Sequence, residues 1–272
     1  FKGHQTVGAA WGYLGNAEIM KQLQSYMDQA YALAETDQQK QLVKLWDESL
    51  WAYMKAGRRS YVDRMSFTIP EVNAPKVAKA HGDVSKVDWN KAASLGDKWY
   101  KRGGKQPAVN KMGGQVCHDG EYLYLKLIDY VDPKKLVVSP QIACFDDWEI
   151  FLAGQRAQPF RQYMIGPTAM IRGISYGEVN WRQGVLATEY TKKAFGLKAV
   201  SDTRRNKWIL KLSFPLSDIL EKPIKSGDDI YANFMRVRNP VLSGERPYGI
   251  DTWVAYTTVK DVDRLAKIHL VK

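Results

Sequence analysis

The spacing of apolar residues changes once along this chain of 272 residues, and that change limits the folds open to it. Between Asn16 and Ala34 apolar side chains recur every three or four positions, which is the period of an amphipathic helix. Thr36 followed by Gln39 has the pattern of a capping box, so a second helix is expected to begin there. We therefore predict an α-helical hairpin over residues 1–65, with a glycine, Gly57, weakening or ending its second helix.

Residues 66–86 contain two prolines and are predicted to form a linker and the entry to a second unit. Beyond them the apolar residues alternate with polar ones, most clearly in Tyr122–Ile128 and Trp208–Phe214, as in half-buried strands. Many short strands separated by Gly and Pro turns predict a mainly β fold, an antiparallel β-sandwich over residues 87–272. Further strands are expected near 143–152, 161–166, 169–175, 196–201, 229–237 and 253–259.

The chain is basic, with 40 Lys and Arg against 29 Asp and Glu and a net charge of +11. An excess of this size occurs in proteins that bind nucleic acid, anionic membranes or acidic polysaccharides. Here the basic residues are dispersed among acids, in clusters no longer than pairs such as Lys134-Lys135, so nucleic acid is not expected as a partner. No apolar run is long enough to span a bilayer.

The two cysteines, Cys117 and Cys144, show neither CxxC spacing nor neighbouring histidines in a cluster, which excludes zinc and redox motifs. An interstrand disulfide in an exported protein and a pair of buried thiols both remain open, and the thiols are the commoner case. The histidines do not support a metal site or a catalytic triad, because they are scattered at His4, His81, His118 and His269.

Three acids stand inside the apolar stretch CFDDWEIFLA, which covers residues 144–153. Alternation places Asp146 on one face of the predicted strand, and Asp147 and Glu149 together on the other. Their Cα atoms would be about 6.6 Å apart, which does not exclude an inverting glycosidase pair, whose carboxyls stand roughly 6.5–9.5 Å apart. The sequence shows no apolar niche that would keep one acid protonated, which argues against catalysis. A ligand-binding pair and acids balanced by arginines are the other interpretations.

Several short motifs of the second unit follow one another in an order that resembles family 9 carbohydrate-binding modules, which are DOMON-like β-sandwiches. The pieces look like the family's D-x-x-Y-L-Y strand, D-x-V-E-I-F strand, W-to-P-L strand with a short helix, N-x-x-R strand and late tryptophan. In the same order, these segments are His118-Asp-Gly-Glu-Tyr-Leu-Tyr124, Asp146-Asp-Trp-Glu-Ile-Phe151, Trp208 to Ile219, Tyr231-Ala-Asn-Phe-Met-Arg236 and Trp253. Val87-Asp88 and Trp99, which precede them in the chain, match the start of the family's pattern.

The helical part, with Trp51-Ala-Tyr-Met54 and Gly57-Arg-Arg-Ser-Tyr61, is similar to the C-terminal tail of large bacterial glycoside-hydrolase-like proteins. The resemblance implies a non-catalytic module from the C-terminal end of a larger protein, secreted, periplasmic or at the cell surface. Its partners would be a saccharide or polysaccharide and the catalytic domain of the parent chain. The net positive charge would favour uronic or sulfated sugars.

In the resembled family the glutamate of the D-x-V-E strand accepts hydrogen bonds from sugar hydroxyls, and two tryptophans clamp the ring. Glu149 matches the glutamate and Trp253 the later tryptophan, whereas Ala143 stands where the first tryptophan belongs. The family's site asparagine and arginine are replaced by Ile250 and Met164. Other aromatics could take over the clamp, and the candidates are Trp148, Trp181 and Tyr163.

Each candidate residue also has a structural alternative. Glu149 could form a salt bridge with Arg236 or Arg238 across the sheet, or these arginines could orient the acid or meet the ligand. Trp253 could be a core tryptophan. The long connector 239–249 carries Arg246 and Tyr248, which we name as further ligand contacts.

The resemblance leaves open a calcium ion, since family members often bind calcium through loop carboxylates. No cofactor is expected otherwise. The carboxylates in suitable places for calcium are Asp119, Asp129 and Asp132.

Two other functions stay open: a structural spacer that braces a catalytic domain through an apolar patch on the hairpin, and a glycoside hydrolase that uses Asp147 and Glu149.

Overall fold

The computed structural model describes residues 11–12, 15–139, 142, 145–180, 185–191, 194–246, 248–258 and 261–272. The chain divides into two compact units, Phe1–Thr68 and Ile69–Lys272. Residues 69–86, which we expected to form a linker and entry, lie in the second unit and include its first strand, β1 (Glu71–Ala74). Among the residues described, no helix combines the length and the apolar character needed to cross a bilayer.

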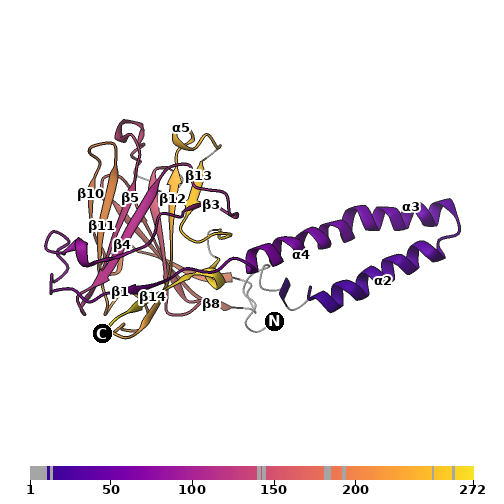
Figure 1. Cartoon of the computed structure of the whole chain (residues 1–272), viewed down its shortest axis with the longest axis horizontal. Helices are drawn as coiled ribbons and strands as arrows, with labels where there is room; N and C mark the ends of the chain where they lie inside the picture. The colour runs from indigo at the N-terminus through magenta and orange to yellow at the C-terminus, as the bar shows by residue number, and fades with distance from the viewer. Residues whose placement is uncertain are drawn as a thin grey trace. The chain divides into compact units, whose positions relative to one another are not determined.

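The first unit is an antiparallel helical hairpin of α2 (Ala17–Leu33) with a continuous helical segment of α3 (Asp37–Trp46), the π-helical turn η1 (Asp47–Trp51) and α4 (Ala52–Met65) (Figure 1). The capping box predicted at Thr36 and Gln39 is present. The expectation that Gly57 ends the helix is wrong, because α4 continues to Met65. Gly57 instead permits a close approach: a Cβ there would lie 2.5 Å from the ring of Trp11.

The second unit is a β-sandwich of a nine-stranded and a five-stranded sheet, so the predicted fold class is confirmed. Of the strand pairs described, only β1–β14 is parallel. The nine-stranded sheet has the order β1, β14 (Ala266–Leu270), β12 (Asp229–Arg238), β6 (Asp147–Ala153), β7 (Phe160–Ile165), β8 (Ile171–Asn180) and β9 (Val185–Thr191), with β13 (Gly249–Thr252) on β12 and β3 (Tyr100–Lys101) on β13. The five-stranded sheet has the order β10 (Lys198–Asp202), β11 (Trp208–Pro215), β5 (Tyr122–Asp129), β4 (Met112–His118) and β2 (Ala93–Ser94).

Short helices lie in the connections of the sandwich. They are η2 (Trp89–Lys91), η3 (Pro133–Lys135), η4 (Ala194–Gly196), α5 (Pro240–Ser243) and η5 (Val262–Arg264). The strand expected near 253–259 is not formed over its described part, Trp253–Thr258, which is irregular. Asn233 holds this segment, because its side-chain amide donates to the hydroxyls of Thr252 and Thr257, each at 3.0 Å.

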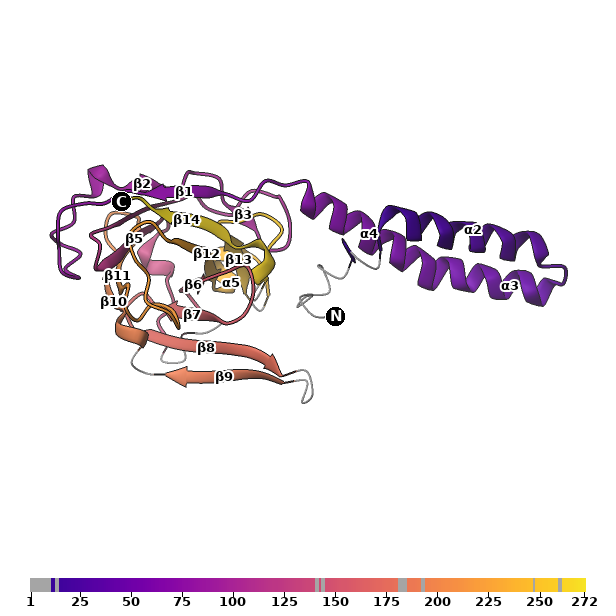
Figure 2. The ribbon, with the colours of Figure 1, turned by 90° about the horizontal axis from the view of Figure 1, so that it is seen from below.

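The main apolar core fills the space between the two sheets, which Figure 2 shows as separate layers. The alternation predicted for β5 and β11 is confirmed, since Leu125 of β5 pairs with Leu212 of β11 and both are buried. In β6, Trp148, Ile150 and Leu152 belong to this main core. The alternate residues of β6 therefore point to the other face of the nine-stranded sheet, which we call its outer face.

A second apolar cluster lies on that outer face. It is built from alternate residues of β6, β7, β8, β12 and β13 and is covered by residues of the connections. Its buried members are Ile142, Phe151, Ala153, Phe160, Met164, Ile174, Tyr176, Met235, Val237, Ile250, Val262 and Leu265, and Met170, Tyr231 and Tyr248 pack against them.

Candidate ligand site on the outer face of the nine-stranded sheet

Asp147 and Glu149 lie on the outer face, as the alternation predicted. Asp147 is paired in register with Val237 of β12, and Glu149 lies between Met235 of β12 and Met164 of β7. Their own exposed fractions are 0% and 7%. Two carboxyl groups are therefore buried next to the second apolar cluster.

Burial changes the protonation of both acids. It raises the pKa of Glu149 to about 7, although a hydrogen bond from Gln162 and the charge of Arg102 act in the opposite direction. Burial and the neighbouring Glu149 together raise the pKa of Asp147 well above its ordinary value. The expectation that these acids have no apolar environment is therefore wrong. Apolar residues of β7 and β12, which are distant from them in the sequence, provide it.

Two polar residues from other parts of the chain act on Glu149: Gln162 of β7 through a hydrogen bond, and Arg102 through its charge. The hydroxyl of Tyr176 on β8 donates to Oε1 of Gln162 at 2.9 Å, which leaves the amide group of Gln162 to donate to Glu149. Arg102 follows β3 and is exposed, so it marks the solvent side of the site. The sequence did not single out Tyr176 or Arg102, because only the fold brings Tyr176 to Gln162 and the charge of Arg102 near Glu149.

Several oxygens of the two acids have no partner. Within the described part of the chain, both carboxyl oxygens of Asp147 and Oε2 of Glu149 are buried without a hydrogen bond. Buried polar groups are satisfied in the great majority of native proteins, so each exception calls for an explanation. Hydroxyl groups of a ligand would supply the missing donors.

Arg236 and Arg238 lie on the opposite side of the sheet, inside the sandwich, and are fully buried. Arg236 pairs with Asp129 at 2.9 Å and with Asp146 at 2.7 Å. Arg238 pairs with Asp129 at 2.8 Å and with Asp251 at 2.7 Å. The two arginines are therefore not placed to contact a ligand on the outer face. They also form no salt bridge with Glu149, because their charges pair with Asp129, Asp146 and Asp251. The inward position expected for Asp146 is confirmed.

Trp253 is also inside the sandwich. Its exposed fraction is 2%, its ring stacks on Phe234 at 5.1 Å between centroids, and its Nε1 donates to the carbonyl of Leu95 at 2.8 Å. The stacking role expected for Trp253 does not fit this position, because neither face of the ring is open. Two replacement candidates, Trp148 and Tyr163, are fully buried in the same core. The third candidate, Trp181, and Ala143 lie outside the described residues.

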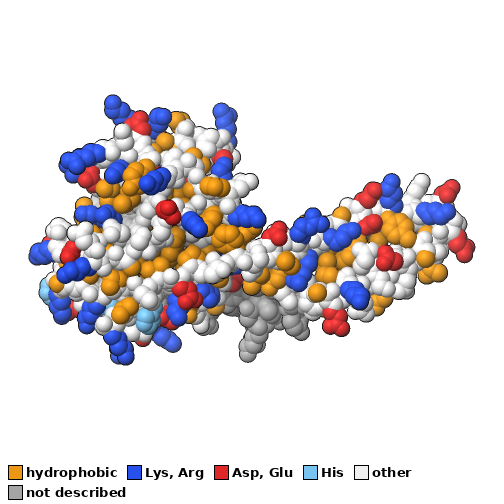
Figure 3. All heavy atoms as spheres, in the orientation of Figure 1, with side chains coloured by type: hydrophobic (Ala, Val, Ile, Leu, Met, Phe, Trp, Pro, Cys, Tyr) orange, Lys and Arg blue, Asp and Glu red, His pale blue; other side chains and the backbone are white. Residues whose placement is uncertain are grey.

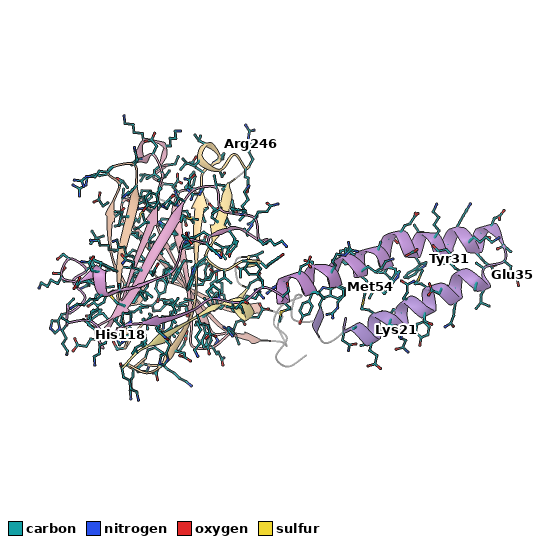
Figure 4. All side chains as sticks on the ribbon, in the orientation of Figure 1. Lys21, Tyr31, Glu35, Met54, His118 and Arg246 are labelled. Atoms are coloured by element: carbon teal, nitrogen blue, oxygen red, sulfur yellow. The ribbon has the colours of Figure 1, made fainter. Side chains whose placement is uncertain are left out.

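Tyr248 is the predicted aromatic residue that lies on the outer face. It is half-buried and packs against the second apolar cluster, which includes Met235 and Val237 beside the two acids. Arg246, two residues earlier, is exposed and extends from the connection between α5 and β13 (Figure 4). Of the predicted ligand contacts, the structure thus brings Asp147, Glu149 and Tyr248 to one face of the sheet.

The carboxylates considered for calcium have other partners. Asp119 accepts five hydrogen bonds from the backbone and Tyr124, Asp129 pairs with two arginines, and Asp132 caps η3. No group of three or more His, Cys, Asp or Glu side chains suited to a metal occurs in the described ranges. Cys117 is a free, buried thiol, and burial raises its pKa to about 12, whereas Cys144 lies outside these ranges.

No protein-family model and no curated protein matches the sequence. Among solved structures, the sandwich is similar to a protein of Bacteroides uniformis ATCC 8492 described as a proposed carbohydrate-binding protein, with 12% identity and a TM-score of 0.51 over 74% of this chain and 99% of that one. Two structures of a family 9 carbohydrate-binding module from Caldicellulosiruptor kristjanssonii, with glucose and with cellotriose, match at 14% and 12% identity and TM-scores of 0.46 and 0.43. They cover 74% of this chain and 95% and 93% of theirs. The second unit therefore shares the β-sandwich fold of the Bacteroides uniformis structure.

Proposed function

We propose that the sandwich is a non-catalytic saccharide-binding module whose site is the outer face around Asp147 and Glu149. The observation that carries the proposal is the set of three buried carboxyl oxygens without partners. Saccharides offer many hydroxyl donors in fixed geometry, and a carboxylate can accept two of them at once. The resemblance of the D-x-x-E strand to that of sugar-binding modules supports the same site.

The neighbours of the acids suggest how a sugar would be held. Gln162 keeps one oxygen of Glu149 engaged, so the unpartnered Oε2 and both oxygens of Asp147 are left for the ligand. The half-buried ring of Tyr248 offers an apolar surface for the C–H face of a pyranose. The exposed Arg102, whose charge acts on Glu149, can donate to ring or hydroxyl oxygens of the sugar.

The proposed ligand is a neutral saccharide. Although the whole chain has a net charge of +11, the site itself holds two carboxyl groups. A uronic or sulfated sugar would place its own negative charge beside these two carboxyl groups in a poorly solvated environment. Local repulsion therefore outweighs the weak attraction of the dispersed basic surface, over which Lys and Arg are interspersed with acids (Figure 3).

The wider setting of the module rests on the resemblance alone. We propose that it belongs to the C-terminal end of a larger secreted glycan-processing protein and acts beside a catalytic domain of that chain. A hydrolase that uses Asp147 and Glu149 is less well supported, because it needs one carboxyl group held ionised beside a protonated one. Here burial raises the pKa of both.

Isothermal titration calorimetry with neutral, uronic and sulfated saccharides tests the proposal. The wild type is expected to bind a neutral sugar, and Glu149→Gln to weaken that binding at least tenfold, since it loses an acceptor oxygen. Glu71→Gln on the exposed edge strand β1 is the matched control and should bind like the wild type. No binding by the wild type across the panel would refute the function, and equal affinity of Glu149→Gln would refute the site.

A further inference from the structure

One side of the helical hairpin exposes large apolar side chains. Small helical units normally bury such residues against a neighbour. We call this set the hairpin face: Tyr26 (54% exposed) and Leu33 (76%) on α2, with Leu42 (55%), Trp46 (53%), Leu50 (45%) and Tyr53 (71%) on α3, η1 and α4.

The positions of these six residues around their helix axes place them on the same side of the hairpin. Each of them directly precedes a residue that faces the partner helix and is half-buried or buried, as Tyr26 precedes Met27 and Leu50 precedes Trp51. One step along an α-helix turns the side-chain direction by about 100°. Because the two helices are antiparallel, the same step backwards on each helix leads to the same side of the hairpin. Hydrogen bonds from Trp51 to Gln24 and from Tyr31 to Asp47 connect the two helices and show which of their sides face each other.

The opposite side of the hairpin is charged. Residues that directly follow the inward positions include Asp28, Glu35, Lys44, Glu48 and Lys55, and Lys44 pairs with Glu48 at 3.6 Å. Figure 3 shows charged side chains along the hairpin. Figure 4 labels Glu35, one of these charged residues, and Tyr31, which contacts Asp47 of the other helical segment.

The neighbours of the hairpin face along each helix are nearly free of charge. Positions three and four residues away in the same helix hold uncharged side chains, apart from Asp47, which accepts a hydrogen bond from Tyr31 and pairs with Lys55. The hairpin face is thus an apolar surface with a rim of Gln and Ser. The other exposed large apolar residues of the hairpin, Tyr31, Leu45, Val62 and Met65, lie outside this face.

We propose that the hairpin face is a homodimer interface, covered by the hairpin of a second copy of this chain. In a two-fold symmetric interface the same surface meets itself, so charges near the axis would face their own kind. An uncharged face avoids this repulsion, and aromatic residues such as Trp46 and Tyr53 are typical of interface centres.

The area of the hairpin face is also sufficient. At roughly 200 Å² for a whole large side chain, the six exposed fractions amount to about 700 Å² per copy, close to the roughly 800 Å² per partner of a standard interface. Two hairpins packed in this way form a four-helix bundle, in which each helix gains the second neighbour that a lone hairpin lacks.

Sedimentation velocity of the whole chain between about 1 and 100 µM tests the proposal. The wild type is expected to approach twice the 31.0 kDa mass of one chain as the concentration rises. Trp46→Lys and, separately, Leu50→Lys should sediment as monomers over the same range. Val62→Lys is the matched control, because Val62 is 47% exposed on α4 but directly follows an inward residue; it should dimerise like the wild type.

Circular dichroism at each sample's concentration shows whether the variants keep their helices. A wild type that stays monomeric at 100 µM overturns the proposal and leaves the face for a different partner, such as another domain. A wild-type dimer that survives both Trp46→Lys and Leu50→Lys also overturns it, since the interface would then lie elsewhere. Neither outcome depends on saccharide binding.

Discussion

Glu149 and Arg236 lie on opposite faces of the same pair of strands. Glu149 of β6 is paired with Met235 of β12, and Arg236, the next residue of β12, points into the sandwich to Asp129 and Asp146. Arg236, one of the two arginines expected from the sequence as a partner of Glu149, is therefore separated from its side chain by the sheet. This arrangement leaves Glu149 without a cationic partner in direct contact among the described residues, as its proposed role in binding requires.

The arginine cluster should contribute to stability and not to binding. Asp129→Ala would remove the acceptor of three buried guanidinium hydrogen bonds, one from Arg236 and two from Arg238, while their pairs with Asp146 and Asp251 remain. Removing one partner of a buried pair costs about 3–5 kcal/mol. Asp202→Ala, which breaks the exposed pair with Arg204, should cost less than about 1 kcal/mol. Urea unfolding measures both. Similar losses for the two variants would contradict a structural role for the buried cluster.

The stability of the free protein should fall as the pH rises towards and through about 7. Glu149 has a folded pKa of about 7 against an ordinary value of 4.5, because burial disfavours its charged form. Its protonated form therefore stabilises the fold fully below the unfolded pKa, and this contribution is lost as the pH rises through the folded pKa. The difference corresponds to about 3 kcal/mol.

Glu149→Gln should reduce this pH dependence, and the part that remains would come from Asp147, whose pKa burial also raises. The variant is expected to melt at a higher temperature than the wild type at pH 8 and at a similar temperature at pH 4, because a neutral amide cannot acquire the buried charge. Thermal unfolding across this range is the measurement. A wild type whose melting temperature is flat between pH 5 and 8 would show that Glu149 is not held in an apolar environment.

A second buried acid should behave in the opposite way. Burial raises the pKa of Asp119, but hydrogen bonds outweigh this effect and hold its pKa below the ordinary value. Its contribution to stability is present above the unfolded pKa and is lost as the pH falls through the folded pKa. The donors are the amides of Ala80, His81, Glu121 and Tyr122 and the hydroxyl of Tyr124.

Asp119→Ala should therefore cost about 3 kcal/mol at pH 7, because buried donors lose their acceptor. Asp132→Ala, which removes one exposed hydrogen bond at η3, is the control and should cost less than about 1 kcal/mol. Chemical denaturation at pH 7 compares the two. A calcium-dependent melting temperature that disappears in Asp119→Ala would contradict a purely structural role for this carboxylate.

Periodicity was enough to predict the hairpin and the sandwich, because helices and strands place apolar residues at different intervals. It failed where tertiary contacts decide. Gly57 sits inside a helix because Trp11 packs closely on it, and Trp253 begins an irregular segment because Asn233 binds the loop side chains. Neither contact can be read from local spacing.

The candidate site was predictable only in part, for the same reason. Alternation along β6 placed Asp147 and Glu149 together, but the residues that set their pKa values come from β7 and β12 and from the segment after β3. Pairing β12 with β6 also decides that Arg236 faces the core. Strand register, and not composition, separates the two acids of the outer face from Asp146, which pairs with Arg236 inside the sandwich.

The central claim is that Glu149 is a buried acid whose unpartnered oxygen accepts hydrogen bonds from the hydroxyls of a saccharide. Carboxyl ¹³C NMR titration of Glu149, without and with a saturating neutral saccharide, tests it most directly. We predict a pKa of about 7 in the free protein, and a lower pKa in the complex, because sugar hydroxyls would stabilise the ionised carboxylate. A pKa near 4.5 in the free protein, or a pKa that no saccharide changes, would contradict the account.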